Sequence, residues 1–459
     1  MRARPVTAIA ALVGGAVRGD GTVRVDRVVA DSREAVPGAL FVALPGERAD
    51  GHDFVAEAAA RGASAALLAR DGRWPVPAVV VSHPGAALLD LAADERRAMG
   101  AAVVGITGSS GKTCTKDFTA AVLSIARRTH ASPRSFNTEV GVPVTILGAP
   151  DGTETLVLEM GSRGIGHVAA LCAVARPDVG VVTNVGPAHL ATFGSRENVA
   201  RAKAELVEAL PQSGVAVLNA DDPVVAGFAS VSRARVVTYG VGGHADVRAE
   251  DVSLDEGARA AFTLAADGGA ERVELTVPGE HMVPNALAAA AAGLALGLGL
   301  GECAAGLKDA RVSAWRMEVV EARGGFRILN DAYNANPAST AAALKAARWM
   351  ARERRCVAVL GEMAELGDTA YEEHERLGET VARLGIEELV TVGERGRIIA
   401  RGAIREGVEE DHVTMCADGQ EALAAVRRIV RPGDVVLVKA SRVAGLEWLA
   451  GALARRGAG

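Results

Sequence analysis

The loop Thr107-Gly-Ser-Ser-Gly-Lys-Thr113 decides the fold class because of what lies on either side of it. The apolar segment Ala101-Ala-Val-Val-Gly-Ile106 before it predicts a buried strand, and a helical stretch begins near Cys114. A glycine-rich loop between a strand and a helix binds phosphate through its backbone N–H groups, while a following lysine adds charge and a threonine can ligate Mg²⁺. We therefore expect a nucleoside triphosphate site rather than a plain Gly/Ser turn. The predicted phosphate-binding residues are Thr107, Gly108, Ser109, Ser110, Gly111, Lys112 and Thr113.

Alternating apolar runs and helical stretches extend from this loop in both directions. The alternation is typical of an α/β protein with mostly parallel sheets, in which ligands bind at the carboxyl ends of the strands. We expect three domains: a small α/β domain over residues 1–98, a central nucleotide-binding domain with a mostly parallel sheet over residues 99–312, and a second open-sheet domain over residues 313–459. Further strands are expected at residues 156–158, 179–183, 215–218, 327–329, 357–360, 389–392 and 435–438.

The composition excludes several other classes of protein. Of 459 residues, 49% are hydrophobic and 23% charged, and 50 basic against 56 acidic side chains give a net charge of −6. A nucleic-acid-binding surface requires a basic excess, and membrane insertion requires about 20 consecutive apolar residues, more than the run at residues 286–301 provides. Five cysteines without metal-binding spacing indicate reduced thiols and a cytoplasmic protein. We expect residues 6–17 to form an amphipathic helix rather than a secretory signal.

Three side chains are candidates for a metal site. Glu159 follows a predicted strand, where its carboxylate can hold Mg²⁺ near the phosphates, or can simply cap a helix. His189 follows the next strand, where a structural hydrogen bond is the alternative. Lys203, in the helical stretch 197–210, is either a surface lysine in an ion pair or a buried amine that reacts with CO₂ to form a carbamate. Only six of the 50 basic residues are lysines, which favours a chemical role.

Polar clusters at residues 219–222, 279–285 and 331–339 are candidate ligand-binding loops. Asn285, at the start of an alanine-rich helix, can contact an adenine edge, and Arg316 lies just before the third cluster. Asx and proline turns are the alternative for each cluster taken alone. Together, the clusters favour a ligand site.

The order of these motifs resembles that of the Mur ligases, ATP-dependent amino-acid ligases of peptidoglycan precursor synthesis, along essentially the whole chain. The resemblance implies a UDP-precursor-binding N-terminal domain, a central P-loop ATPase domain, and a Rossmann-like C-terminal domain that closes over ATP. The segments that carry it are Asp31-Ser-Arg33, Pro37-Gly-Ala-Leu-Phe-Val42, residues 107–117, Ser135-Phe-Asn-Thr-Glu-Val-Gly-Val-Pro143, Glu159-Met-Gly161, residues 184–189, Lys203, residues 219–222, Asn285, Arg316, residues 331–337, Leu360-Gly-Glu-Met-Ala-Glu-Leu-Gly367 and Val438-Lys-Ala-Ser-Arg442.

The resemblance also implies roles for individual residues. Thr113 and Glu159 would hold one Mg²⁺, and His189 with carbamylated Lys203 a second. For ATP, the implied contacts are Lys112 and Arg316 with the phosphates, Asn285 with adenine and Asp331 with the ribose. The residues implied in catalysis are Lys112, Lys203, His189, Glu159 and Arg316. Those implied in substrate binding are Ser32 and Arg33 near the uridine, and Asn137, Thr138, Ser162, Arg163, Asn334 and Asn336 elsewhere.

Within the family, the chain is most similar to the member that joins D-Ala-D-Ala to UDP-MurNAc-tripeptide through an acyl phosphate. That reaction gives UDP-MurNAc-pentapeptide, ADP and phosphate, and it serves cell-wall biogenesis, cell shape and division. The alternatives are a relative that adds a single amino acid to the UDP-MurNAc peptide or glutamate to folate, and a non-catalytic ATP-binding partner protein. We expect a monomer that acts on these small molecules, without nucleic acid or membrane insertion.

Three positions depart from the expected pattern. Gly108 lies three residues before Gly111, where a standard P-loop has glycines five residues apart. Thr138 stands where the family pattern has Asn, and Ala440 where it has Gly. The last two are expected near the acceptor or the dipeptide, so they bear on substrate choice rather than on the reaction.

Overall fold

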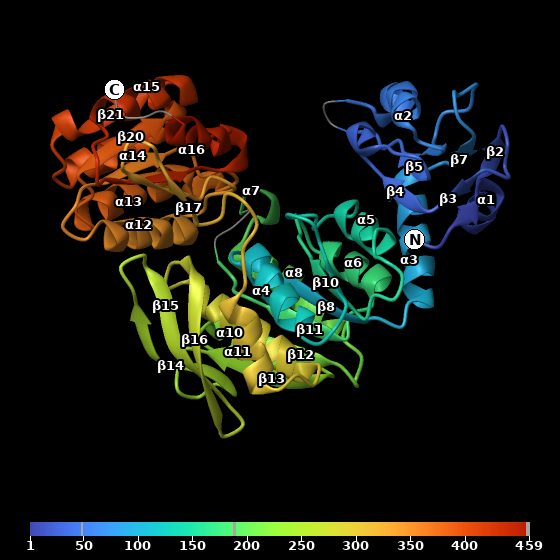
Figure 1. Cartoon of the computed structure of the whole chain (residues 1–459), viewed down its shortest axis with the longest axis horizontal. Helices are drawn as coiled ribbons and strands as arrows, with labels where there is room; N and C mark the ends of the chain where they lie inside the picture. Colours follow the sequence, from blue (N-terminus) through green and yellow to red (C-terminus); the bar gives the residue numbers. More distant parts are fainter. Residues whose placement is uncertain (47–48, 187–189, 456–459) are drawn as a thin grey trace.

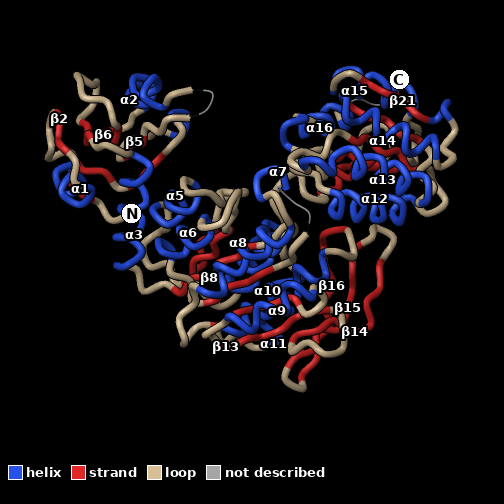
Figure 2. The backbone as a smooth tube through the Cα atoms, turned by 180° about the vertical axis from the view of Figure 1, so that it is seen from behind, coloured by secondary structure: helices blue, strands red, loops and turns tan. Residues whose placement is uncertain are grey.

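The computed structural model describes residues 1–46, 49–186 and 190–455, which form three α/β lobes (Figure 1). The N-terminal lobe, in blue, and the C-terminal lobe, in orange and red, lie at opposite ends of the central lobe (Figures 1 and 2). Each lobe is built on its own large sheet. The predicted fold class, α/β with mostly parallel sheets in three domains, is confirmed.

The N-terminal lobe contains a five-stranded sheet in which β2 is antiparallel to its neighbour and the other pairings are parallel. The helix expected over residues 6–17 is shorter, because Gly14 adopts a left-handed conformation (φ 64°) and ends it at Val13. The strands in spatial order are β2 (Ala16–Arg18), β7 (Ala78–Val80), β6 (Ala65–Leu68), β5 (Ala39–Val42) and β4 (Arg27–Val29), with β1 (Arg4–Pro5) and β3 (Arg24–Val25) paired separately. The helices are α1 (Val6–Val13), α2 (Val55–Arg61) and α3 (Pro84–Ala98).

The central lobe contains a nine-stranded sheet that is parallel from β9 to β14 and antiparallel from β14 to β16. Strands β10, β11 and β12 are buried along their whole length, as expected for parallel strands covered on both faces. The strands in spatial order are β16 (Gly269–Pro278), β15 (Arg259–Ala266), β14 (Val247–Leu254), β13 (Arg235–Gly240), β12 (Val215–Asn219), β11 (Val179–Val182), β8 (Ala102–Thr107), β10 (Thr155–Glu159) and β9 (Thr129–Ala131).

Helices α4 and α10 pack against each other on this sheet, and the alanines of α10 allow the close approach. Seven small or apolar residues in a row, 286–292, are fully buried there. The helices of the central lobe are α4 (Lys112–Ser124), α5 (Gly141–Leu147), α6 (His167–Ala175), α7 (Leu190–Phe193), α8 (Arg196–Glu208), α9 (Pro223–Gly227), α10 (Met282–Ala295) and α11 (Leu300–Lys308).

The C-terminal lobe contains a six-stranded sheet that is parallel except at the edge strand β17. Its strands in spatial order are β17 (Glu318–Glu321), β18 (Arg327–Asn330), β22 (Val435–Lys439), β19 (Cys356–Leu360), β20 (Glu388–Val392) and β21 (Val413–Cys416). Its helices are α12 (Pro337–Ala351), α13 (Ala370–Arg383), α14 (Gly393–Arg405), α15 (Gly419–Ile429) and α16 (Glu447–Ala454).

Several polar contacts join the C-terminal lobe to the central lobe, among them those of Asp117 and Trp349. The Asp117 carboxylate on α4 accepts hydrogen bonds from the backbone N–H and the hydroxyl of Ser313, at 2.7 and 2.9 Å. The Trp349 indole N–H on α12 donates to the carbonyl of Asp255, between β14 and β15, at 2.8 Å. Among the helices described, none is long and apolar enough to cross a membrane.

Candidate active site

The loop between β8 and α4 has a backbone that only glycine allows at two positions. Gly108 and Gly111 have φ angles of 146° and 79°. A side chain at Gly108 would collide with the Thr183 hydroxyl, and one at Gly111 with the Asn285 amide. The loop therefore packs directly onto groups of two other elements, and α4 begins at Lys112 with its free N–H groups at the mouth of the site.

Lys112 lies between two cavities and lines both. Its Nζ donates to the carbonyl oxygens of Gly108 and Ser109, at 2.7 and 3.3 Å. Burial lowers the pKa of Lys112, and the positive charge of Arg316 lowers it further, while Glu159 opposes the shift. An anionic phosphate at this position would relieve both effects.

Thr113 and Glu159 place two side-chain oxygen groups that can ligate a metal ion next to each other, at the carboxyl end of β10. The Thr113 hydroxyl donates to Glu159 Oε2 at 2.7 Å, and Asn137 Nδ2 donates to Glu159 Oε1 at 2.7 Å. Both Thr113 and Glu159 are almost fully buried, yet both line the cavity. A hydroxyl and a carboxylate are hard oxygen ligands, so these residues fit a Mg²⁺ ion held beside phosphates.

The first cavity, of about 370 Å³, lies between the central and C-terminal lobes. The C-terminal lobe reaches the phosphate loop directly, because Asn336 Nδ2 donates to Ser110 Oγ at 2.8 Å. Asn334 and Asn336, which were assigned to substrate binding, line this cavity and not the second one. The predicted residues that line the first cavity are Ser109, Ser110, Gly111, Lys112, Thr113, Asn137, Glu159, Asn285, Arg316, Asp331, Asn334 and Asn336.

Arg316 is the clearest sign of an anionic ligand in this cavity. Its guanidinium lies over the Tyr333 ring, 4.2 Å from the centroid, and Nη2 donates to Ser135 Oγ at 3.1 Å. Its Nε is buried and has no hydrogen-bond partner in the described part of the chain. A buried donor without a partner is costly, so a phosphate that accepts from it would be stabilised.

Asp331 and Asn285 are held by neighbouring side chains. Asp331 forms an ion pair with Lys439 and accepts from the Met317 N–H at 3.1 Å. The Asn285 amide accepts from the Thr115 hydroxyl and donates to the His281 carbonyl, both at 3.2 Å. These contacts orient both side chains before any ligand arrives.

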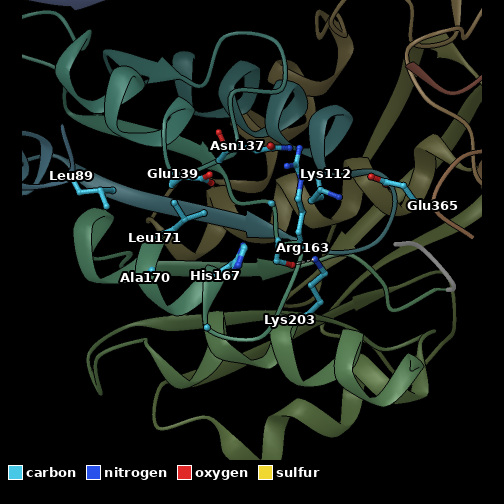
Figure 3. Close-up of a pocket in the computed structure, with 14 residues that line it drawn as sticks. Leu89, Lys112, Asn137, Glu139, Arg163, His167, Ala170, Leu171, Lys203 and Glu365 are labelled. Carbon is cyan, nitrogen blue, oxygen red and sulfur yellow. Dashed lines mark hydrogen bonds between the residues drawn. The ribbon is translucent and has the colours of Figure 1, made fainter. Parts of the chain in front are cut away.

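The second cavity, of about 480 Å³, extends from Leu89 on α3 to Glu365 in the C-terminal lobe, as Figure 3 shows. Lys112, Arg163 and Lys203 lie between these ends (Figure 3). The predicted residues that line it are Lys112, Asn137, Thr138, Ser162, Arg163 and Lys203. It therefore adjoins the first cavity at Lys112 and Asn137.

Lys203 is buried on α8, with 2% of its surface exposed. Its Nζ donates to Ser162 Oγ at 2.6 Å and lies 5.9 Å from the centroid of the Phe193 ring. Burial lowers the pKa of Lys203 well below its ordinary value, Lys112 adds to the effect, and Glu205 opposes it. The surface ion pair considered for Lys203 is therefore wrong, and the alternative of a buried amine is the one that this environment fits.

Other predicted residues lie elsewhere. His189 lies outside the described residues, and within those described, no group of three or more His, Cys, Asp or Glu side chains could hold a metal ion. Thr107 is fully buried and donates to the Met160 carbonyl at 2.8 Å, so it supports the loop from beneath. Ser32 and Arg33 line a third cavity, of about 470 Å³, in the N-terminal lobe.

Four residues at these cavities were missed from the sequence. Lys439 and His281 line the first cavity, and Glu139 and Glu365 line the second. Lys439 directly follows a predicted strand, as Glu159 does, and is one of only six lysines, as Lys203 is, so these two signals together could have found it. Glu365 follows β19 within a segment that carried the family resemblance, and a carboxylate after a parallel strand was its signal.

Comparisons with known proteins agree with this arrangement. Three family models match the chain in order: a Mur ligase family catalytic domain at residues 24–99, a Mur ligase middle domain at residues 106–293, and a Mur ligase glutamate ligase domain at residues 315–442. These matches include the phosphate loop, the Lys203 helix and the Asp331 cluster.

Whole-chain relatives and solved structures extend the similarity. The UDP-N-acetylmuramoyl-tripeptide–D-alanyl-D-alanine ligase of Mycobacterium tuberculosis is 46% identical over 98% of this chain and 97% of its own. The ligase of that name from Escherichia coli is 34% identical over 97% of both. The structure of MurF from Acinetobacter baumannii superposes with a TM-score of 0.87 at 30% identity, over 99% of both chains. The structure of MurF ligase from Thermotoga maritima in complex with ADP superposes with a TM-score of 0.79 at 31% sequence identity. That match covers 93% of this chain and 96% of the Thermotoga chain. The chain belongs to the Mur ligase family.

Proposed function

We propose that this chain is the ATP-dependent ligase that joins D-Ala-D-Ala to UDP-MurNAc-tripeptide, giving UDP-MurNAc-pentapeptide, ADP and phosphate. Relatives named UDP-N-acetylmuramoyl-tripeptide–D-alanyl-D-alanine ligase align with nearly the whole chain, at up to 46% sequence identity. The observation that carries the proposal is the position of Lys112, which lines both the nucleotide cavity and the Lys203 cavity. A γ-phosphate beside Lys112 would therefore face a carboxylate bound in the second cavity.

In the first step, an oxygen of the tripeptide carboxylate attacks the γ-phosphorus of ATP. The P–O bond to the β-phosphate breaks, ADP leaves, and an acyl phosphate forms. Lys112 and Arg316 would offset the charge on the phosphoryl oxygens, in a buried site where such interactions are strong. This activation is needed because a free carboxylate is a poor electrophile.

In the second step, the amine of D-Ala-D-Ala attacks the acyl carbon. The C–N bond forms, the C–O bond to phosphate breaks, and inorganic phosphate leaves while the nitrogen loses its extra proton. The chain needs to hold both reactants in position and to exclude water, and closure between the C-terminal and central lobes serves both purposes.

Mg²⁺ would neutralise charge on the transferred phosphoryl group. Thr113 and Glu159 would hold one ion. Lys203 would take part in a second site with His189 as a carbamate, formed when its neutral amine adds to CO₂ and releases a proton. The burial of Lys203 and its lowered pKa support that modification.

We also infer the division of labour along the chain. Residues 1–98 would bind the UDP end of the precursor through Ser32 and Arg33, residues 99–312 would bind ATP, and residues 313–459 would complete the nucleotide site. Ser162, Arg163, Asn137 and Thr138 would contact the peptide. The enzyme would act as a cytoplasmic monomer.

The test is release of ADP and phosphate from Mg²⁺-ATP and UDP-MurNAc-tripeptide, with and without D-Ala-D-Ala, together with the mass of the product. We expect release that requires the dipeptide and a product heavier by one dipeptide less water. Release with a single amino acid instead would assign the chain to another member of the family. Nucleotide binding without release, whatever the acceptor, would contradict a ligase.

A further inference from the structure

We propose that the Glu365 carboxylate binds the ammonium group of the incoming D-Ala-D-Ala, which makes Glu365 an acceptor-binding residue. The inference rests on the proposed function. Glu365 lies in the segment between β19 and α13 of the C-terminal lobe and lines the cavity that holds Lys112 and Lys203. In Figure 3 its carboxyl end points toward Lys112.

The positive charges that line this cavity attract the anionic precursor but repel the ammonium group of the acceptor dipeptide. Lys112 and Arg163 are cations that attract the carboxylate and phosphate of the activated precursor. The amine acceptor arrives as an ammonium and is repelled by the same groups. Among the described lining residues, the carboxylates that can attract it are Glu139 and Glu365.

The two carboxylates lie at different ends of the cavity. Glu139 is on the side of Leu89, which belongs to α3 of the N-terminal lobe, whereas Glu365 is at the opposite end beyond Lys112 (Figure 3). The precursor bound by the N-terminal lobe enters from the Leu89 side, so its reacting carboxyl group reaches Lys112 from there. The amine must attack that carbon from the remaining side, which is where Glu365 lies.

The backbone at Glu365 is held in an unusual conformation by both lobes. Glu365 has a φ of 63°, which is unfavourable for a residue with a side chain and persists only where neighbours impose it. Its carbonyl accepts from the Ala191 N–H of the central lobe at 3.3 Å. Within the same segment, Met363 N–H donates to His374 Nε2 at 2.9 Å, and the Glu362 carbonyl accepts from Ser441 N–H at 3.0 Å.

This arrangement couples acceptor binding to lobe closure. The phosphate loop and Lys203 belong to the central lobe, while Glu365 belongs to the C-terminal lobe and reaches the cavity only where the two lobes meet. The amine would thus be placed beside the acyl phosphate in the closed form. Glu365 binds and orients the ammonium, which gives up one proton to solvent, and the neutral amine then attacks in the step described above.

The experiment compares Glu365→Gln with the wild type in two assays. With D-Ala-D-Ala, we expect the KM of the dipeptide to rise about 10- to 100-fold, the range for losing a hydrogen bond to a charged group. With hydroxylamine in place of the dipeptide, we expect an unchanged yield of hydroxamate. Hydroxylamine is uncharged at neutral pH, so its attack on the acyl phosphate, which releases phosphate, does not require Glu365.

Two matched variants make the comparison specific. Glu362→Gln removes the same charge from the same segment but not from the cavity, and we expect wild-type constants from it. Glu139→Gln removes the other carboxylate, and we expect the KM of the dipeptide to change less than threefold, roughly within the scatter of exposed substitutions. Thermal unfolding of each variant confirms that it folds.

An unchanged dipeptide KM in Glu365→Gln, or a larger rise in Glu139→Gln, would overturn the proposal. An equal loss in the hydroxylamine assay would also overturn it, because Glu365 would then act in the first step. In another outcome, the wild-type enzyme forms hydroxamate and uses a single amino acid but not the dipeptide. That result would contradict D-Ala-D-Ala as the acceptor, independently of the role of Glu365. The same variants assayed with that amino acid would then decide the role of Glu365.

Discussion

The first cavity, beside the phosphate loop, and the third cavity, in the N-terminal lobe, differ in how firmly their side chains are held; we call them the nucleotide cavity and the N-terminal cavity. Around the phosphate loop, Thr113 and Glu159 are 2% and 1% exposed and are bonded to each other. In the N-terminal cavity, the Arg33 side chain is 76% exposed and pairs with Asp31, two residues away. Groups that stabilise a transition state must be fixed before the reaction, whereas groups that hold a distant part of a substrate need only attract it. Substitutions in the first region should therefore lower kcat, and those in the second should raise KM.

The strongest test of this contrast is Lys203→Arg. Arginine keeps a positive charge but cannot form a carbamate and does not fit the space around Ser162. We expect kcat to fall about 10³-fold, the upper range for loss of one group that stabilises transition-state charge. Steady-state rates and calorimetric titration with ATP measure turnover and nucleotide binding separately.

Lys308→Arg is the matched control, because Lys308 is exposed on α11. It should keep wild-type turnover, and ATP should still bind to Lys203→Arg. A Lys203→Arg enzyme with near-wild-type kcat would show that no carbamate is required.

The next largest effect is expected from Glu159→Ala. Loss of the buried carboxylate removes the oxygen ligand that we propose for Mg²⁺ and leaves Thr113 and Asn137 without their acceptor. We expect kcat to fall about 10²-fold and the Mg²⁺ dependence of ATP binding to weaken. Titration of ATP at several Mg²⁺ concentrations measures the second effect, with Glu154→Ala, an exposed carboxylate before the same strand, as control. A Mg²⁺ dependence equal to that of the wild type would remove Glu159 from the metal site.

His374 in the C-terminal lobe is, like Thr113 and Glu159, a buried polar side chain that is held by hydrogen bonds. It is fully buried, its Nε2 accepts from Met363 N–H, and its Nδ1 donates to the Ala370 carbonyl. Burial lowers the pKa of His374 below its ordinary value of 6.5, so the unfolded state takes up the proton first as the pH falls. The stability that neutral His374 contributes is complete above about pH 6.5 and is lost on acidification below it.

We therefore expect the free energy of unfolding to fall less in His374→Gln than in the wild type between about pH 7 and 5, by roughly 1 kcal/mol. Denaturant titration at each pH provides the measurement. Parallel pH curves for wild type and His374→Gln would mean that His374 does not titrate with unfolding.

The smallest effect is expected from Arg33→Ala. The pair with Asp31 is exposed to solvent and adds little to stability, so the variant should unfold like the wild type. We expect the KM of UDP-MurNAc-tripeptide to rise about 10-fold, the effect of losing one charged contact, with kcat unchanged. Initial rates over a range of precursor concentrations test this, with Arg27→Ala as the exposed control. A fall in kcat with unchanged KM would contradict a role for Arg33 in substrate binding alone, because it is the result expected for a residue around the phosphate loop.

The same contrast explains what the sequence could predict. The phosphate loop was predictable because its glycines, lysine and threonine act within one strand–loop–helix unit. The position of Asn336 beside the phosphate loop could not be predicted, because its contact with Ser110 spans 226 residues and depends on how two lobes meet. Strands β14 to β16 were not predicted, since exposed charged residues interrupt their apolar pattern, and β-bulges break its period.

Labelling the terminal carboxylate of the tripeptide with oxygen-18 tests the central claim most directly. If that carboxylate attacks the γ-phosphorus beside Lys112, one labelled oxygen must leave with phosphate when the amine attacks. We predict one oxygen-18 atom in each phosphate released with D-Ala-D-Ala, measured by phosphorus NMR or mass spectrometry. Unlabelled phosphate from a reaction that still makes pentapeptide would contradict an acyl phosphate, and with it the account of how the two cavities work together.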